Sequence, residues 1–180
     1  MMKNILLLYY FLFVVNVTLP AQNFVSWSNE KLTWGNFRGH VPANAWAEAI
    51  TMSGMYFSFD QVDAAAVNVT VIGQFDEANS WVKPGSKLDE VLSHEQLHFD
   101  ISELNARLLR KFFVEQTFTY KMDLTLLFKR CYNESMQKLR RMQNEYDTQT
   151  QNGTNSSAQN FAHEALRLQQ TKNKTAKYFS

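Results

Sequence analysis

A long amphipathic segment in the middle of the chain constrains the fold more than any other feature. Apolar side chains recur at helical intervals over residues 88–113, which predicts one helix with a continuous buried face. Ser86 is the predicted N-cap, with Asp89 three residues later as its capping-box partner. The same helix contains the pentapeptide HEQLH at residues 94–98, so the element that organises the core also carries reactive side chains.

The part of the chain before this helix has the composition of strands and loops. Residues 55–60 are rich in aromatic side chains, and residues 66–75 alternate with a period of two, which predicts a strand with one buried face. Two further helices are predicted at about residues 122–147, ended by Gly153, and residues 157–177. This order predicts an α+β fold, with an N-terminal antiparallel or mixed sheet packed on the HEQLH helix and two helices after it.

The first 21 residues have the pattern of a secretory signal peptide. Lys3 precedes an apolar run at residues 5–19, and Pro-Ala-Gln follows at residues 20–22. The run is shorter than the roughly 20 residues that a membrane-spanning helix needs. We therefore expect residues 1–21 to be a cleaved leader, with an uncleaved anchor as the alternative, and residues 22–180 to form a single secreted or periplasmic domain.

Composition narrows the choice of partners. The formal net charge is +1, from 18 Lys and Arg against 17 Asp and Glu, which gives no basis for a nucleic-acid partner. After removal of the leader, nothing predicts stable insertion into a membrane. Cys131 is the only cysteine, so no intramolecular disulfide can form, and its helical spacing indicates a buried side chain. A secreted domain of this size without a disulfide fits a bacterial periplasm or exterior.

The HEQLH pentapeptide has the spacing of a metal-binding helix. Two side chains four positions apart lie about 40° apart on a helix, one turn above the other, so His94 and His98 can bind one Zn²⁺ from the same side. Glu95 is offset to one side, where its carboxylate can accept a proton from an attacking water. The pattern predicts His94 and His98 as zinc ligands and Glu95 as the general base of a metallopeptidase. The alternative is a pair of solvated histidines on a helix surface.

Two acidic residues later in the same helix lie off this direction. Asp100 and Glu103 point more than about 100° away from the two histidines, so neither is expected to bind the metal. Glu103 is expected to form a surface ion pair with Arg107, four residues later. The alternative for these acidic residues is to orient the site without binding the metal.

Several motifs, in order along the chain, resemble those of a known family. They are LTW at residues 32–34, FRG at 37–39, SWVK at 80–83, HEQLHFDI at 94–101 and YD at 146–147. With them the chain resembles the bacterial domain of unknown function 922 family, described as predicted secreted zinc-dependent proteases. The resemblance covers most of the chain after the leader. It implies a zincin-like fold, His94 and His98 as zinc ligands, and Glu95 as the catalytic base.

One position departs from the family pattern. The pattern has a histidine, a candidate third ligand, where this chain has Asn152. A neutral carboxamide is a poor zinc ligand, and catalytic zinc normally has three protein ligands and an open position. Asp147, His163 and Glu134 are the alternatives for the third ligand, with a slight preference for Asp147.

Three functions are therefore open at this point. The first is a secreted zinc metallopeptidase that hydrolyses a peptide or protein substrate. The second, motivated by Asn152, is a catalytically inactive zincin-like module with a binding role in the periplasm or cell envelope. The third is a structural α+β domain in which Trp27, Trp34 and Trp81 are only core aromatics, although Trp81 is also placed to line a cleft before the HEQLH helix. Tyr146 is expected in the core, with stabilisation of an oxyanion by its hydroxyl as the alternative.

Overall fold

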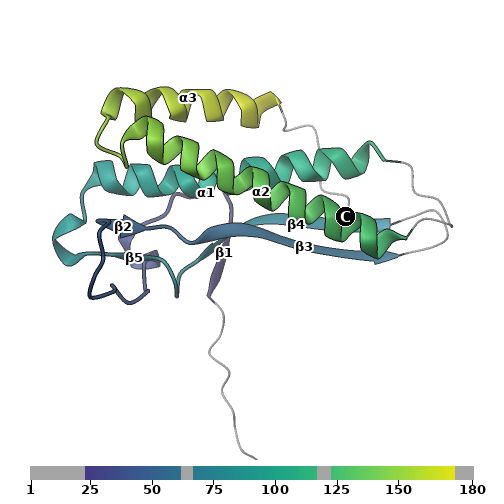
Figure 1. The fold of residues 1–180 in the computed structure, drawn as a ribbon, viewed down its shortest axis with the longest axis horizontal. Helices are drawn as coiled ribbons and strands as arrows, with labels where there is room; N and C mark the ends of the chain where they lie inside the picture. The colour runs from purple at the N-terminus through teal and green to yellow at the C-terminus, as the bar shows by residue number, and fades with distance from the viewer. Residues whose placement is uncertain (1–22, 62–66, 117–122, 173–180) are drawn as a thin grey trace, which may run out of the picture.

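The computed structural model describes residues 23–61, 67–116 and 123–172. Over these ranges the chain forms small antiparallel sheets and three helices (Figure 1), so the predicted α+β class is confirmed. The predicted signal peptide lies outside the described residues. No helix in the described part of the chain is both long enough and apolar enough to cross a bilayer.

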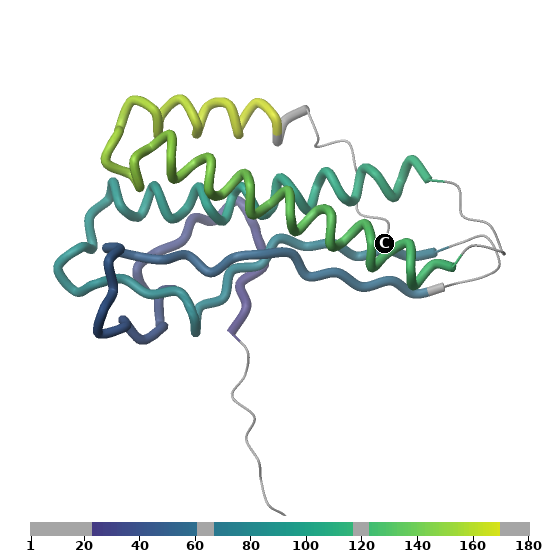
Figure 2. The backbone as a smooth tube through the Cα atoms, in the orientation of Figure 1, coloured from purple at the N-terminus to yellow at the C-terminus, as the bar shows by residue number. Residues whose placement is uncertain are grey.

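The main sheet has three strands in the order β1-β4-β3. Strands β3 (Ser53–Gln61) and β4 (Val67–Asp76) form a long antiparallel pair that is easily followed in Figure 2. Strand β1 (Phe24–Ser26) pairs with the other edge of β4. β3 and β4 correspond to the two strands predicted from composition and alternation.

A second, two-stranded sheet lies at the end of the molecule that carries the HEQLH motif. Strands β2 (Ala49–Ile50) and β5 (Trp81–Val82) pair antiparallel. Two short 3₁₀ helices, η1 (Trp34–Asn36) and η2 (Pro84–Ser86), flank this sheet in sequence. Because β5 is followed by η2 and then by the HEQLH helix, the small sheet leads into the start of that helix.

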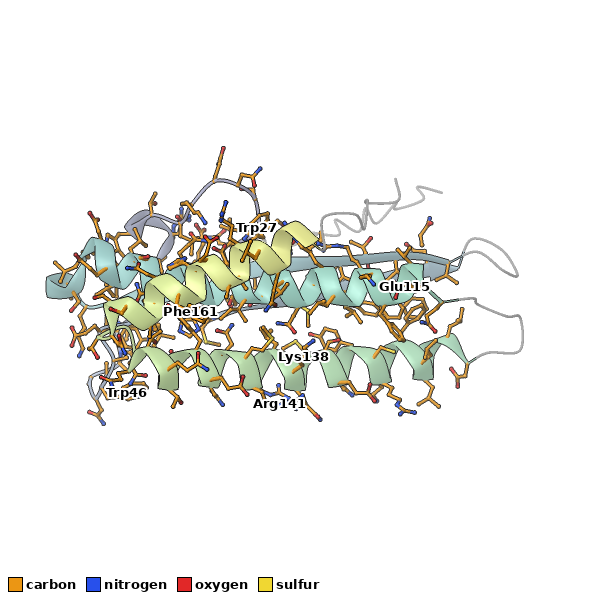
Figure 3. All side chains as sticks on the ribbon, turned by 90° about the horizontal axis from the view of Figure 1, so that it is seen from above. Trp27, Trp46, Glu115, Lys138, Arg141 and Phe161 are labelled. Carbon is orange, nitrogen blue, oxygen red and sulfur yellow. The ribbon has the colours of Figure 1, made fainter. Side chains whose placement is uncertain are left out.

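The three helices lie on one side of the main sheet (Figure 1). Helix α1 (Asp89–Val114) packs on β4 and β3, and helix α2 (Leu124–Thr150) packs on α1 and β3. Seen from above, α1 and α2 run side by side (Figure 3). Helix α3 (Ser156–Lys172) packs on both. The predicted end of the third helix, residues 173–177, lies outside the described residues.

The core between the sheet and the helices is formed by side chains from the main sheet and from all three α-helices. They are Met55 and Val71 from the sheet, Leu97, Ile101 and Leu104 from α1, Phe128, Cys131 and Leu139 from α2, and Leu166 from α3. Cys131 is buried, as predicted. Gly73 lets α1 approach β4, since a Cβ at this position would lie 2.9 Å from the Cα of Glu103. This close contact fixes the height of the HEQLH helix above the sheet.

The predicted N-cap of α1 is wrong. The helix begins at Asp89 with Leu88 in the capping position, and no side chain caps it. Ser86 belongs to η2, where the preceding Pro84 starts a 3₁₀ turn, and its hydroxyl donates to the carboxylate of Glu48 instead. A tertiary partner thus outcompeted the local capping interaction.

Candidate metal centre

The two histidines of the HEQLH motif lie side by side on α1. The Nε2 atoms of His94 and His98 are 3.2 Å apart, and their ring centroids are separated by 4.8 Å. His94 is buried, whereas His98 is partly exposed. One helical turn therefore places both imidazoles on the same side of the helix, as the spacing predicts.

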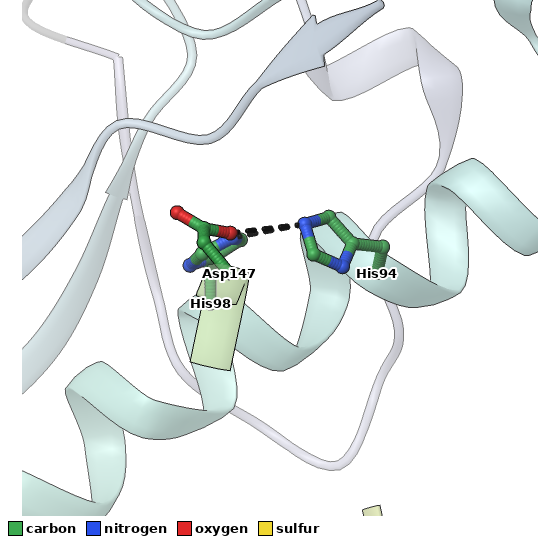
Figure 4. A group of neighbouring side chains, drawn as sticks. All are labelled: His94, His98 and Asp147. Atoms are coloured by element: carbon green, nitrogen blue, oxygen red, sulfur yellow. Dashed lines mark hydrogen bonds and ion pairs between the residues drawn. The ribbon is translucent and has the colours of Figure 1, made fainter. Parts of the chain in front are cut away.

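Helix α2 brings Asp147 to these two rings (Figure 4). Its Oδ1 atom lies 2.9 Å from Nε2 of His98 and 3.2 Å from Nε2 of His94. One ligand atom from each of the three residues lies within 4.8 Å of the other two. Two imidazole nitrogens and a carboxylate oxygen form a donor set suited to Zn²⁺. The side chain of Asp147 is 37% exposed, so this group opens to solvent.

The other candidates for a third ligand are directed elsewhere. His163 on α3 has its Nε2 atom 3.0 Å from the hydroxyl of Ser93, and burial lowers its pKa. Glu134 forms an exposed ion pair with Arg130 and precedes Asp147 on α2 by roughly 20 Å along the helix axis. Asn152 is exposed in the turn after α2. The structure therefore unites only Asp147, among these residues, with the two histidines.

The group of three stabilises a positive charge between its members. Partial burial alone would raise the pKa of Asp147, but hydrogen bonds with His94 and His98 outweigh it and hold this pKa well below its ordinary value. Burial alone would lower the pKa of His98, yet Asp147 and the nearby charge of Glu95 raise it. An anion held next to imidazoles in this way is also the electrostatic arrangement that favours a bound cation.

Glu95 lies in the same cleft with an unsatisfied oxygen. Its side chain is only 4% exposed, and Oε2 is a buried atom without a hydrogen-bond partner among the described residues. An unpaired buried carboxylate oxygen is unfavourable by about 1–3 kcal/mol or more, so this atom calls for an explanation, and a catalytic role is one. The role of Glu95 as a base stays a prediction.

The ring of His94 is held by packing. Tyr146 stacks on it with a centroid distance of 4.7 Å and an interplanar angle of 21°. On the loop after α2, Gly153 approaches so closely that a Cβ there would lie 3.0 Å from Cγ of His94. The Nδ1 atom of His94 is buried and has no partner in the described ranges. The orientation of this ring therefore depends on van der Waals contact and on the interaction of Nε2 with Asp147.

Tyr146 is a core residue, as expected. Burial, with the charges of Glu95 and Asp147, raises its pKa above the ordinary value, so the hydroxyl stays protonated. The hydroxyl lies 3.5 Å from the backbone oxygen of His94, to which it donates.

The ring of His98 is held by a hydrogen bond to Gln143, a residue that was not predicted from the sequence. Oε1 of Gln143 lies within hydrogen-bond distance of Nδ1 of His98, and Nε2 of Gln143 donates to the backbone oxygen of His98 over 3.0 Å. Gln143 precedes Asp147 by one helical turn. That spacing is the signal that could have identified it, once Asp147 was placed against the HEQLH helix.

A cleft of about 520 Å³ lies over the three residues. Its lining includes the segment of residues 46–53, which contains β2, and the turn at residues 151–154. Trp46, one of these lining residues, is 76% exposed. Trp27, Trp34 and Trp81 are not among the lining residues. The alternative role considered for Trp81, lining a cleft before the HEQLH helix, is therefore not seen at this cleft.

Asp100 and Glu103 have structural roles. Asp100 accepts hydrogen bonds from Trp27 and Gln96 and an ion pair from Lys31, which ties the N-terminal loop to α1. Neither residue belongs to the metal-ligand group.

The prediction of a surface pair at Glu103 is wrong. Glu103 does pair with Arg107, at 2.8 Å, but it is only 1% exposed and also bonds Arg110 and the backbone N–H of Gly73. Because α1 packs closely on β4 at Gly73, the Glu103 side chain is buried there, although helical spacing alone predicted it on the surface.

Comparisons with known proteins give no match to a family model, a curated protein or a solved structure. The resemblance to the domain of unknown function 922 family therefore depends on the motifs alone, and the family and the zincin-like fold stay predictions.

Proposed function

We propose that this chain is a secreted or periplasmic zinc metallopeptidase with a zincin-like fold. One observation carries the proposal: His94 Nε2, His98 Nε2 and Asp147 Oδ1 converge at the wall of a cleft that also contains the carboxylate of Glu95. The antiparallel sheet packed against the HEQLH helix supports the fold that the motifs imply. The proposed location is supported by the leader pattern of residues 1–21, outside the described residues.

The residues present fit a catalytic zinc ion. Two imidazoles and one carboxylate are a set found at catalytic zinc sites, where a fourth position is left open. The exposure of Asp147 and the cleft above it supply that opening. A bound Zn²⁺ would polarise a peptide carbonyl and make a water molecule more acidic.

The roles of the protein side chains follow from their places. His94 and His98 would hold the ion through Nε2, and Asp147 would supply the third ligand in place of the histidine absent at residue 152. Glu95, next to His94 on the helix, would accept the proton of the attacking water and deliver it to the leaving amine. Its Oε2 atom has no other hydrogen-bond partner among the described residues. Peptide or protein substrate would enter through the cleft that these residues line.

The test is the substitution Glu95→Gln in the purified mature protein. We expect about one zinc per chain by elemental analysis, and peptide hydrolysis that a chelator abolishes and zinc restores. Glu95→Gln should retain the metal and lose about 10²- to 10⁴-fold in kcat, the usual contribution of a general base. Glu134→Gln, the same chemical change at an exposed position of α2, should keep both zinc and activity. Hydrolysis by Glu95→Gln at the parent rate would contradict the mechanism.

The alternative, an inactive zincin-like binding module, is favoured by one observation. Asn152 is exposed and stands where the family pattern has a histidine. On that alternative, Asn152→His should raise zinc affinity sharply. If Asp147 is the third ligand, the same substitution should change zinc affinity little, because the site is already complete.

A further inference from the structure

We infer that Gln143 is a positioning residue that accepts a hydrogen bond from Nδ1 of His98 and thereby keeps Nε2 of that ring directed at Asp147 and the cleft. Gln143 extends from α2 and contacts His98 on α1 at two points. Its Oε1 meets Nδ1 of the ring, and its Nε2 donates to the backbone oxygen of the same residue over 3.0 Å. In the use of Nε2 by a metal, this inference rests on the proposed function.

The direction of the Gln143 amide follows from its neighbours. A carboxamide has an acceptor at one end and a donor at the other. The backbone oxygen of His98 only accepts, so the NH₂ end must face it. The same end lies 3.4 Å from the hydroxyl of Ser102, which in turn lies 2.8 Å from the hydroxyl of Ser53. Reversing the amide would bring two acceptors together. Oε1 therefore faces Nδ1 of His98, and Nδ1 must carry a proton.

The hydrogen bond at Nδ1 leaves Nε2 of the same ring for the ligand group. Nε2 of His98 lies 2.9 Å from Oδ1 of Asp147 and 3.2 Å from Nε2 of His94. In the metal-free chain Nε2 hydrogen bonds to Asp147, and a bound metal would take the place of that proton. Gln143 thereby orients His98 as a ligand, as hydrogen bonds to the far nitrogen do in known metal sites.

Helix α2 supplies this effect together with the third ligand. Gln143 and Asp147 are four residues apart, so they lie one above the other on the same face. His94 has no comparable partner at Nδ1 within the described residues. Of the two histidines, only His98 has a hydrogen bond at Nδ1 among the described residues. A change confined to His98 therefore distinguishes loss of the Gln143 contact from a general loss of structure at the site.

The decisive measurement is the hydrogen bond at Nδ1 of His98 in the metal-free protein. Proton and nitrogen-15 NMR of the histidine rings, with chelator present, should show an Nδ1 proton of His98 that is shifted downfield and protected from exchange. Gln143→Leu should lose this signal. Gln143→Glu should keep it, because a carboxylate oxygen also accepts from Nδ1. A parent protein without a hydrogen-bonded Nδ1 proton at His98, or a Leu variant with an unchanged signal, would overturn the inference.

Zinc titration gives the second measurement. Gln143→Leu should weaken zinc binding by about 10- to 100-fold, and Gln143→Glu should recover most of this loss. Asn144→Leu, a matched change at the exposed neighbouring position, should leave zinc affinity unaltered. If the parent chain binds no zinc, the proposed function fails, while the hydrogen bond at Nδ1 of His98 in the metal-free chain still decides the role of Gln143.

Discussion

Gly153 combines two constraints at one atom. Its φ of +86° lies in the left-handed region, and a Cβ there would lie 3.0 Å from Cγ and 3.2 Å from Nδ1 of His94. Gly153→Ala therefore strains the backbone and pushes the ring of a proposed ligand at the same time. We expect a loss of about 1–3 kcal/mol in the free energy of unfolding, together with weaker zinc binding, measured by denaturant titration and metal titration.

Gly85 offers a matched control for this substitution. It has no left-handed backbone, and a Cβ there meets nothing within 4 Å. Gly85→Ala should change the free energy of unfolding by no more than about 0.5 kcal/mol and leave zinc affinity as it is. Equal effects of the two substitutions on zinc affinity would show that contact between Gly153 and His94 does not position the ring.

Two ion pairs of the same helical spacing differ in their surroundings. Glu103 and Arg107 on α1 are 2.8 Å apart and nearly buried, whereas Arg130 and Glu134 on α2 are 2.9 Å apart and exposed. Glu103→Gln removes a buried negative charge that two arginines and a backbone N–H share. We expect a loss of about 3–5 kcal/mol in the free energy of unfolding by denaturant titration. Glu134→Gln should have no measurable effect, since exposed pairs contribute little; a similar loss in both variants would contradict this account.

The elements with strong periodicity could be predicted from the sequence, and the short ones could not. Helix α1 and strand β4 each have a repeat long enough to identify the element and its buried face. Strands β2 and β5 have two residues each, too few to show any period, yet the segment that contains β2 forms a wall of the cleft. The capping signal at Ser86 failed because Glu48, distant in sequence, bonds its hydroxyl.

The site residues likewise divide into those that could be predicted from the sequence and those that could not. His94, Glu95 and His98 share one helix, so helical geometry alone sets their relative positions. Asp147 joins them only because α2 packs against α1, and sequence spacing between two helices does not determine which turns meet. The sequence therefore kept Asp147 as one of three alternatives, and Gln143 had no reason to be considered until the contact between the helices was known.

Within the described part of the chain, the two most exposed large aromatic side chains lie in different places on the molecule, which allows a test of where substrate binds. Trp46 and Phe161 are each 76% exposed. Trp46 lines the cleft, whereas Phe161 lies on α3 and is not a lining residue (Figure 3). If substrate packs against Trp46, Trp46→Ala should raise KM by about 5- to 30-fold, the effect of losing an aromatic contact worth about 1–2 kcal/mol. The variant should keep kcat and zinc content, because Trp46 does not belong to the proposed metal-ligand group. Phe161→Ala removes an aromatic side chain of equal exposure and should leave KM unchanged. A rise in KM of similar size in both variants, measured with the same peptide, would place substrate binding outside this cleft.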